Sequence, residues 1–167
     1  MTTLLFLEQV LNGLQLGVTL FLMAAGLTLV FGIMNMVNLA HGSLFMMGAY
    51  YCATLVPLTG SFLLSAVLAI IGAAATGILV ELVALRTLYS RDHLDQVLAT
   101  FGLILFINEL VKIVWGPVAI FMDLPAAFPG NVEIIPGAPY PTYRLVVLGV
   151  GVAVAVFLWW LITRTRL

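Results

Sequence analysis

The feature that most constrains the fold is a long stretch without formal charge. No Asp, Glu, Lys or Arg occurs between Glu8 and Glu81, so only His41 can become positively charged there. Hydrophobic residues make up 63% of the 167 residues and charged residues 8%, and the mean hydropathy is +1.22. Soluble domains carry roughly 25% charged residues, and a small soluble fold leaves much of its surface in water. The composition therefore predicts a protein that lies in a lipid bilayer.

Continuous apolar runs predict an all-α fold, a polytopic transmembrane helical bundle with about five membrane spans. A helix needs about 20 predominantly apolar residues to cross the hydrocarbon, whereas barrel strands alternate over about 10 residues. The runs that meet the helical requirement cover residues 10–33, 39–56, 62–85, 97–115 and 145–162.

The whole chain, residues 1–167, is predicted to form a single transmembrane domain. Residues 116–143 are predicted to be a Pro-rich extracytoplasmic loop, with a short surface helix as an option. Six of the seven prolines lie in this loop, and proline breaks helices because it lacks the amide donor. The chain stops after the last run without a polar tail, so we expect it to be incomplete.

Basic residues predict the orientation. By the positive-inside rule, the connection after the third run and the end of the fifth run are cytoplasmic, which places the N-terminus outside. Arg144 and Lys112 fall on the predicted outer side and weigh against this orientation. The residues that favour it are Arg86, Arg91, Arg164 and Arg166.

A polar segment separates the first two runs. Asn35, Asn38 and His41 recur every three residues, which keeps them near one side of a helix, and Gly42 permits a turn or a close backbone approach. The connection is short, because two spans need roughly 40 residues, so it is a tight turn or a helix broken within the membrane. One interpretation is that these residues cap a cytoplasmic hairpin. The other is that all four line a substrate pathway, as broken helices do in transporters.

No catalytic or metal-binding residue is assigned. Zinc needs three or four ligands, and no second His or Cys lies close to His41 in the sequence. A membrane enzyme with His41 or His93 as general base stays an alternative that needs a nearby acid or nucleophile. The only lysine, Lys112, does not follow a Gly-rich phosphate loop, so the chain does not bind ATP through that motif. The net charge of −1 provides no basic patch for nucleic acid.

Two further patterns concern helix contacts. Glu109 and Lys112 lie three residues apart and are expected to form an ion pair. Small residues spaced by four predict packing sites, because they let membrane helices approach closely. These pairs are Gly13 with Gly17, Ala73 with Gly77, and Gly149 with Ala153.

The polar segment belongs to a longer pattern. The pattern reads GLTLVFG at 26–32, Asn at 35, NLAHG at 38–42, GAY at 48–50, RTL at 86–88, LATFGL at 98–103 and VWGP at 114–117. It resembles the branched-chain amino acid ABC transporter permease family, of which the chain would be the N-terminal portion. The NLAHG element is its most specific part.

The resemblance implies a permease subunit of the cell inner membrane that forms part of the translocation path for branched-chain amino acids. It implies that this chain binds no cofactor and that ATP binds to partner subunits. The implied partners are a second permease subunit, two ATP-binding subunits and an extracytoplasmic solute-binding protein. The Pro-rich loop would be a docking surface for that binding protein or a plain connector. The alternatives are a urea or short-amide permease and a polytopic membrane protein without ATP coupling.

Overall fold

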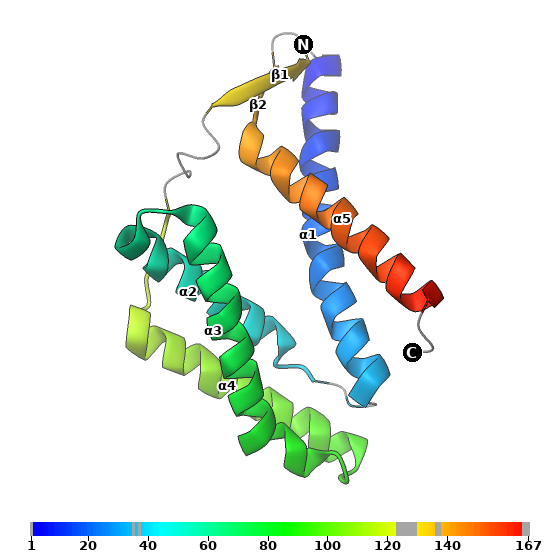
Figure 1. Cartoon of the computed structure of the whole chain (residues 1–167), viewed down its shortest axis with the longest axis vertical. Helices are drawn as coiled ribbons and strands as arrows, with labels where there is room; N and C mark the ends of the chain where they lie inside the picture. Colours follow the sequence, from blue (N-terminus) through cyan, green and yellow to red (C-terminus); the bar gives the residue numbers. More distant parts are fainter. Residues whose placement is uncertain (1, 35, 37, 123–129, 136–137, 165–167) are drawn as a thin grey trace. The chain divides into compact units, whose positions relative to one another are not determined.

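The computed structural model describes residues 2–34, 36, 38–122, 130–135 and 138–164. Figure 1 shows their secondary structure along the chain. The elements are α1 (Thr2–Met34), α2 (His41–Thr59), α3 (Phe62–Val83), the short 3-10 helix η1 (Leu85–Leu88), α4 (His93–Trp115), β1 (Asn131–Ile135), β2 (Ala138–Pro141) and α5 (Thr142–Arg164). The predicted helical membrane fold is confirmed, with one small hairpin added to it.

Within the described residues, four helices are long and apolar enough to cross a membrane. They are Leu5–Gly32 of α1 and the whole of α3, α4 and α5, and they correspond to four of the five predicted spans. The predicted second span, residues 39–56, is the helix α2, which does not reach the same combination of length and apolar composition. Its 19 residues begin with His41 and contain Pro57. They extend over about 28 Å, slightly less than the roughly 30 Å of hydrocarbon.

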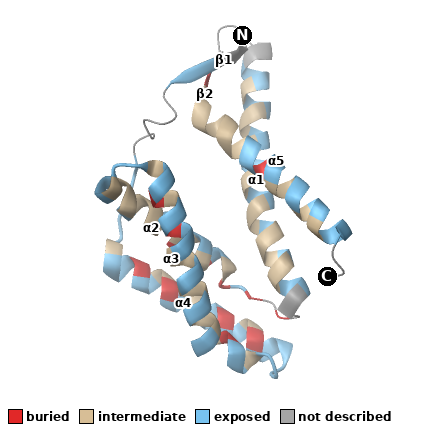
Figure 2. Ribbon diagram, viewed as in Figure 1, coloured by how far each residue is buried: buried red, intermediate tan, exposed pale blue. Residues whose placement is uncertain are grey.

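Internal contacts divide the chain into two compact units. The first unit consists of Met1–Gly26 and Leu124–Leu167, and the second of Leu27–Asp123. Figure 2 shows that the buried residues lie mainly in the second unit, on α2, α3, α4 and the segment before α2. A single transmembrane domain over residues 1–167 stays a prediction.

In the second unit, α2 runs antiparallel to α3. The side chain of Ala73 would lie 3.5 Å from a Cβ added at Gly48. Tyr51 also shares a hydrogen bond of 2.7 Å with the hydroxyl of Thr76, and near the end of α2 the hydroxyl of Thr59 shares one of 2.6 Å with that of Ser65. Ser65 lies near the start of α3, so the two helices run in opposite directions. The turn between the two helices begins at Gly60, whose φ of 65° lies in the left-handed region that favours glycine.

The helices α2 and α4 run parallel. Residues near the start of α2 contact the middle of α4, and residues further along α2 contact its end. The core between them is formed by Met47, Ile107 and Val111, all with less than 5% of their surface exposed. The last two share one face of α4 with the buried Gln96 and Thr100, because their spacing follows the helical repeat.

The first unit contains the hairpin and the contact of α1 with α5. The strands β1 and β2 pair antiparallel, with an irregularity in register between Glu133 and Ile135. The described part of the Pro-rich loop shows no surface helix: it is non-helical at residues 116–122 and forms this hairpin. Its last two residues, 142 and 143, belong to α5. Prolines are compatible with such a two-stranded ribbon because both of its strands are edges.

Candidate functional site

The turn before α2 is organised by Asn38. Only 3% of its surface is exposed, and its Oδ1 accepts a hydrogen bond from the backbone N–H of Ala40 at 3.0 Å. Its backbone carbonyl accepts the N–H of His41 at 3.3 Å. An asparagine that bonds the backbone two residues ahead fixes a turn locally. The residues at 38–41 of the motif thus form the turn that leads into α2.

The other residues of the polar segment have different surroundings. His41 is the first residue of α2 and is half-buried, whereas Gly42 is exposed. A Cβ added at Gly42 would meet none of the described residues within 4 Å, so no close approach among them explains the glycine. Asn35 lies outside the described residues.

A polar contact joins this region to α4. Ser43 lies in the first turn of α2, with only 7% of its surface exposed. Its hydroxyl donates to Oδ1 of Asn108 at 3.3 Å. Two polar side chains from neighbouring membrane helices therefore satisfy each other at the interface between α2 and α4, where an unpartnered polar group would be costly.

An aromatic cluster lies at the other end of the same interface. The ring of Trp115 lies 5.3 Å from that of Tyr50 and 6.0 Å from that of Tyr51, measured between ring centres. Its Nε1 donates to Oγ1 of Thr54 at 2.7 Å. Aromatic side chains with a satisfied polar end are favoured at the edges of a membrane.

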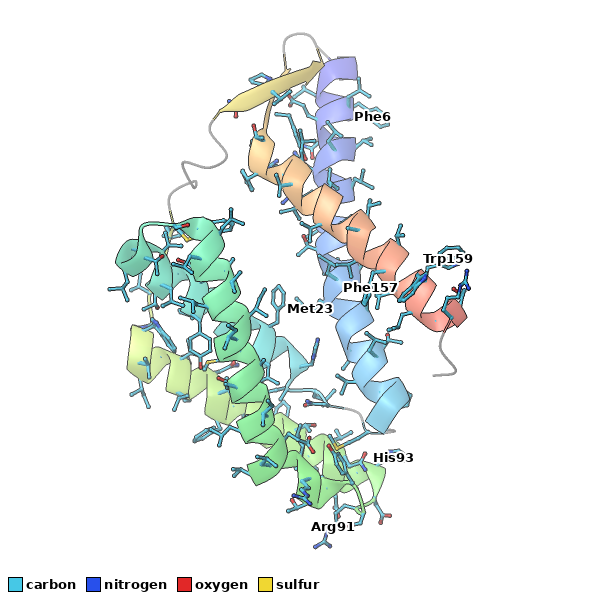
Figure 3. All side chains as sticks on the ribbon, viewed as in Figure 1. Phe6, Met23, Arg91, His93, Phe157 and Trp159 are labelled. Carbon is cyan, nitrogen blue, oxygen red and sulfur yellow. The ribbon has the colours of Figure 1, made fainter. Side chains whose placement is uncertain are left out.

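Charged side chains occur at both ends of α4. Glu109 and Lys112 form the predicted ion pair, with 2.6 Å between carboxylate Oε1 and ammonium Nζ, and both side chains are more than half exposed. At the start of α4, Arg91 projects from the preceding turn and His93 from the first residue of the helix (Figure 3). Within the described chain, no group of three or more His, Cys, Asp and Glu side chains is placed to hold a metal ion.

Two buried acceptors flank the turn between α3 and α4, one on each helix. The side-chain amide of Gln96 donates to the carbonyls of Leu88 at 3.2 Å and Arg91 at 3.1 Å, and so fastens the turn to α4. Its Oε1 and the Oε2 of Glu81 are buried, and neither has a hydrogen-bond partner among the described residues. Oε1 of Glu81 accepts a hydrogen bond from the hydroxyl of Tyr89.

The predicted packing pairs divide into two groups. Ala73 packs against Gly48, as described above, which is a contact of α3 with α2. Among the described residues, nothing lies within 4 Å of a Cβ added at Gly13, Gly17, Gly77 or Gly149, and Ala153 is exposed. The packing role of these five residues stays a prediction.

Two close approaches of helices were missed by the sequence pattern. A Cβ at Gly151 would overlap the side chain of Val18, and a Cβ at Gly72 would lie 3.2 Å from the ring of Tyr51. A pattern of small residues marks which helices can approach, and the bulky partner on the other helix decides where they do. Val18 and Tyr51 lie far away in the sequence, so no local signal identifies these two glycines.

Comparison with known proteins decides the family. The profile of a family described as the branched-chain amino acid transport system permease component matches residues 9–167. The chain belongs to this permease family. The match includes the turn at Asn38, the contact between Ser43 and Asn108, α1 from residue 9 onward, and the whole of α2, α3, α4 and α5.

Individual relatives agree with the permease family. The chain is 35% identical over 137 residues to the high-affinity branched-chain amino acid transport system permease protein LivH of Escherichia coli K12, and equally to LivH of Salmonella typhimurium. It is 31% identical over 135 residues to BraD, the permease protein of the corresponding system of Pseudomonas aeruginosa. The matches cover 77%, 77% and 75% of this chain but only 44%, 44% and 43% of the relatives. The matched region is thus less than half the length of these curated relatives. No solved structure matches the chain.

Proposed function

We propose that this chain is part of a permease subunit of an ATP-driven importer and forms part of the translocation path for branched-chain amino acids. The observation that carries the proposal is the family match over residues 9–167. The relatives LivH and BraD are named as permease proteins of branched-chain amino acid transport systems. The helices that are apolar enough to cross a membrane supply the scaffold that such a path requires.

The proposed roles of the polar segment differ from residue to residue. The hydrogen bond from Ala40 to the side chain of Asn38 supports a turn-stabilising role for Asn38. His41 is half-buried at the start of α2, and we assign it, with Asn35 and the exposed Gly42, to the border of the path. Polar groups at membrane depth are costly and tend to line pathways.

The proposed assembly contains further chains. A second permease subunit completes the path, two ATP-binding subunits supply the energy, and an extracytoplasmic solute-binding protein delivers the amino acid. The Pro-rich loop 116–143 is proposed to lie outside the membrane with the N-terminus, and Arg164 to lie at the cytoplasmic end of α5. The hairpin gives the loop a folded surface for contact with the solute-binding protein.

Uptake of labelled leucine tests the proposal. The complete transport system is expressed in cells that lack their own high-affinity leucine uptake. Uptake is expected to require this subunit and to disappear when the phosphate-loop lysine of the partner ATPase is replaced. Uptake that persists with the inactive ATPase would support a membrane protein without ATP coupling. Inhibition by urea or acetamide, with none by isoleucine or valine, would support the short-amide alternative.

Substitution of the two histidines separates the pathway from the enzyme alternative. His41→Leu is expected to lower leucine uptake at an unchanged amount of inserted protein. His93→Leu is the matched control, because His93 is exposed at the start of α4, and it is expected to leave uptake near the wild-type level. Full function of the double variant would exclude both a pathway role for His41 and a histidine general base.

A further inference from the structure

The first unit holds an arginine cluster, which we define as Asn12, Tyr140, Tyr143 and Arg144. The guanidinium of Arg144 donates from Nη1 to Oδ1 of Asn12 and from Nε to the hydroxyl of Tyr143, the latter at 3.1 Å. Its central carbon lies 5.7 Å from the ring centre of Tyr140 and 5.8 Å from that of Tyr143. Both distances are typical of cation–π contacts, so the charged group has a defined position.

Three elements build the cluster. Asn12 belongs to α1, Tyr140 to β2, and Tyr143 and Arg144 to the first turn of α5. Tyr140 is only 5% exposed, and its hydroxyl donates to the backbone carbonyl of Leu11 at 3.3 Å. The hairpin is thereby fastened to α1 beside the arginine. A cation that is ordered before its ligand arrives loses less conformational freedom on binding.

The contacts of Arg144 do not neutralise its charge. Asn12, Tyr140 and Tyr143 are uncharged, and the one ion pair found among the described residues joins Glu109 to Lys112. The hydrogen bonds to Asn12 and Tyr143 use two of the five N–H donors of the guanidinium. The guanidinium fork suits an anion with two oxygens, such as a carboxylate or a phosphate.

The cluster lies at the end of two candidate membrane spans. Arg144 is the third residue of the candidate span Thr142–Arg164. Asn12 follows the start of Leu5–Gly32 by seven residues, about 10 Å. That span of 28 residues would be about 42 Å long and exceeds the roughly 30 Å of hydrocarbon. Both residues therefore lie close to the level at which headgroups, water and aromatic side chains meet.

We propose that the arginine cluster binds one oxyanion at the membrane border. The ligand is the phosphate of a phospholipid headgroup or the carboxylate of a small solute, since both present paired oxygens to the guanidinium. The proposal goes beyond the proposed function, and binding can be measured without transport or ATP, so the two can fail separately.

The test measures binding to the full chain purified in an uncharged detergent. One arm compares dioleoyl phosphatidylglycerol with dioleoylglycerol, which has the same acyl chains without the phosphate, by native mass spectrometry. The other arm measures labelled leucine, with leucinol as the competitor that lacks the carboxylate. Each arm uses Arg144→Gln, Arg144→Lys and Asn12→Ala. Arg91→Gln is the control, because Arg91 is an exposed arginine outside the cluster.

Arg144→Gln is expected to lower the affinity for one of the two oxyanions by at least about tenfold, as loss of a charge-assisted hydrogen bond does. Arg144→Lys is expected to be intermediate because it keeps the charge and loses the fork, and Asn12→Ala is expected to cause a smaller loss. Arg91→Gln should bind like the wild type. Dependence on Arg144 in the lipid arm identifies a headgroup site, and dependence in the leucine arm identifies a solute site.

Binding by Arg144→Gln equal to that of the wild type in both arms would overturn the proposal. A wild-type chain that binds phosphatidylglycerol no better than dioleoylglycerol, and leucine no better than leucinol, would overturn it as well. Should the neutral variant fail to insert, Arg144→Lys and Asn12→Ala decide the matter, and wild-type affinity in both variants would count against the site.

Discussion

The hydroxyl of Tyr89 donates a hydrogen bond to Oε1 of Glu81 and so closes the turn between α3 and α4. Loss of water around the hydroxyl, followed by its bond to Glu81 and the negative charge of that carboxylate, raises the pKa of Tyr89 to about 12. The charge of Arg86 opposes the shift. This hydrogen bond therefore requires a protonated Tyr89 hydroxyl.

This bond predicts a loss of stability in alkali. The pKa of Tyr89 is higher in the folded chain, about 12, than its ordinary value of 10.0. The stabilisation is therefore complete below about pH 10 and is lost as the pH rises from there to about 12. Thermal unfolding in detergent micelles, followed by helical circular dichroism from pH 8 to 12, should show this decline. In Tyr89→Phe the decline should be smaller, and an equal decline would contradict the assignment to Tyr89.

The contact of Gly151 with Val18 predicts a steric defect in one variant. Gly151→Ala places a methyl group where the Val18 side chain lies, and overpacking of this kind typically costs about 1–3 kcal/mol. Gly149→Ala is the matched control, because its new methyl group would meet no atom of the described residues within 4 Å. Unfolding by SDS in mixed micelles measures both variants.

A second substitution tests the cause of that defect. Val18→Ala removes the two methyl groups of the valine, so it should restore most of the stability lost in Gly151→Ala. An equal loss of stability at positions 149 and 151, with no rescue, would mean that α1 and α5 do not meet at Val18 and Gly151.

The turn at Asn38 predicts a difference between two neighbouring substitutions. Asn38→Ala removes the acceptor for the N–H of Ala40, and loss of a buried hydrogen bond costs about 0.5–1.5 kcal/mol, with more when a donor stays unpaired. Leu39→Ala is the control, because Leu39 is 39% exposed. Hydrogen–deuterium exchange should speed up at Ala40 and His41 in the first variant. Unchanged protection of these amides would argue against the turn.

The bond between Ser43 and Asn108 predicts energetic coupling. A double-mutant cycle with Ser43→Ala and Asn108→Ala should give a coupling energy of about 0.6 kcal/mol, the average for polar contacts between membrane helices. A cycle that pairs Ser43 with Thr76 is the control, since Thr76 bonds to Tyr51 instead. Equal coupling in the two cycles would show that the contact does not form.

The helices of this chain can be predicted from its sequence because a continuous apolar run in lipid has few alternatives to the helical conformation. The predicted run 62–85 contains α3 (Phe62–Val83), and the predicted run 97–115 ends with α4 at Trp115. The first residue of a helix is harder to predict than the helix itself. α1 begins at Thr2 although its run begins at residue 10, because Glu8 and Gln9 are good helix formers and give no signal to stop.

Contacts between residues far apart in the sequence could not be predicted from it. Ser43 and Asn108 are separated by 65 positions, and Asn12 and Arg144 by 132. Periodicity indicates which face of a helix is polar, but it does not say which helix that face meets. The turn interpretation of Asn38 needed only local information, because the partner of its side chain is two residues away. A pathway role for Asn38 stays a prediction.

The parallel course of α2 and α4 has a consequence for sidedness. If both helices cross the bilayer, the segments before them, around Asn38 and Arg91, lie on the same side of the membrane. Trp115, at the end of α4, then lies on the opposite side. A membrane-impermeant thiol reagent should therefore reach cysteines placed at positions 39 and 91 from the same side, whichever way the chain is inserted.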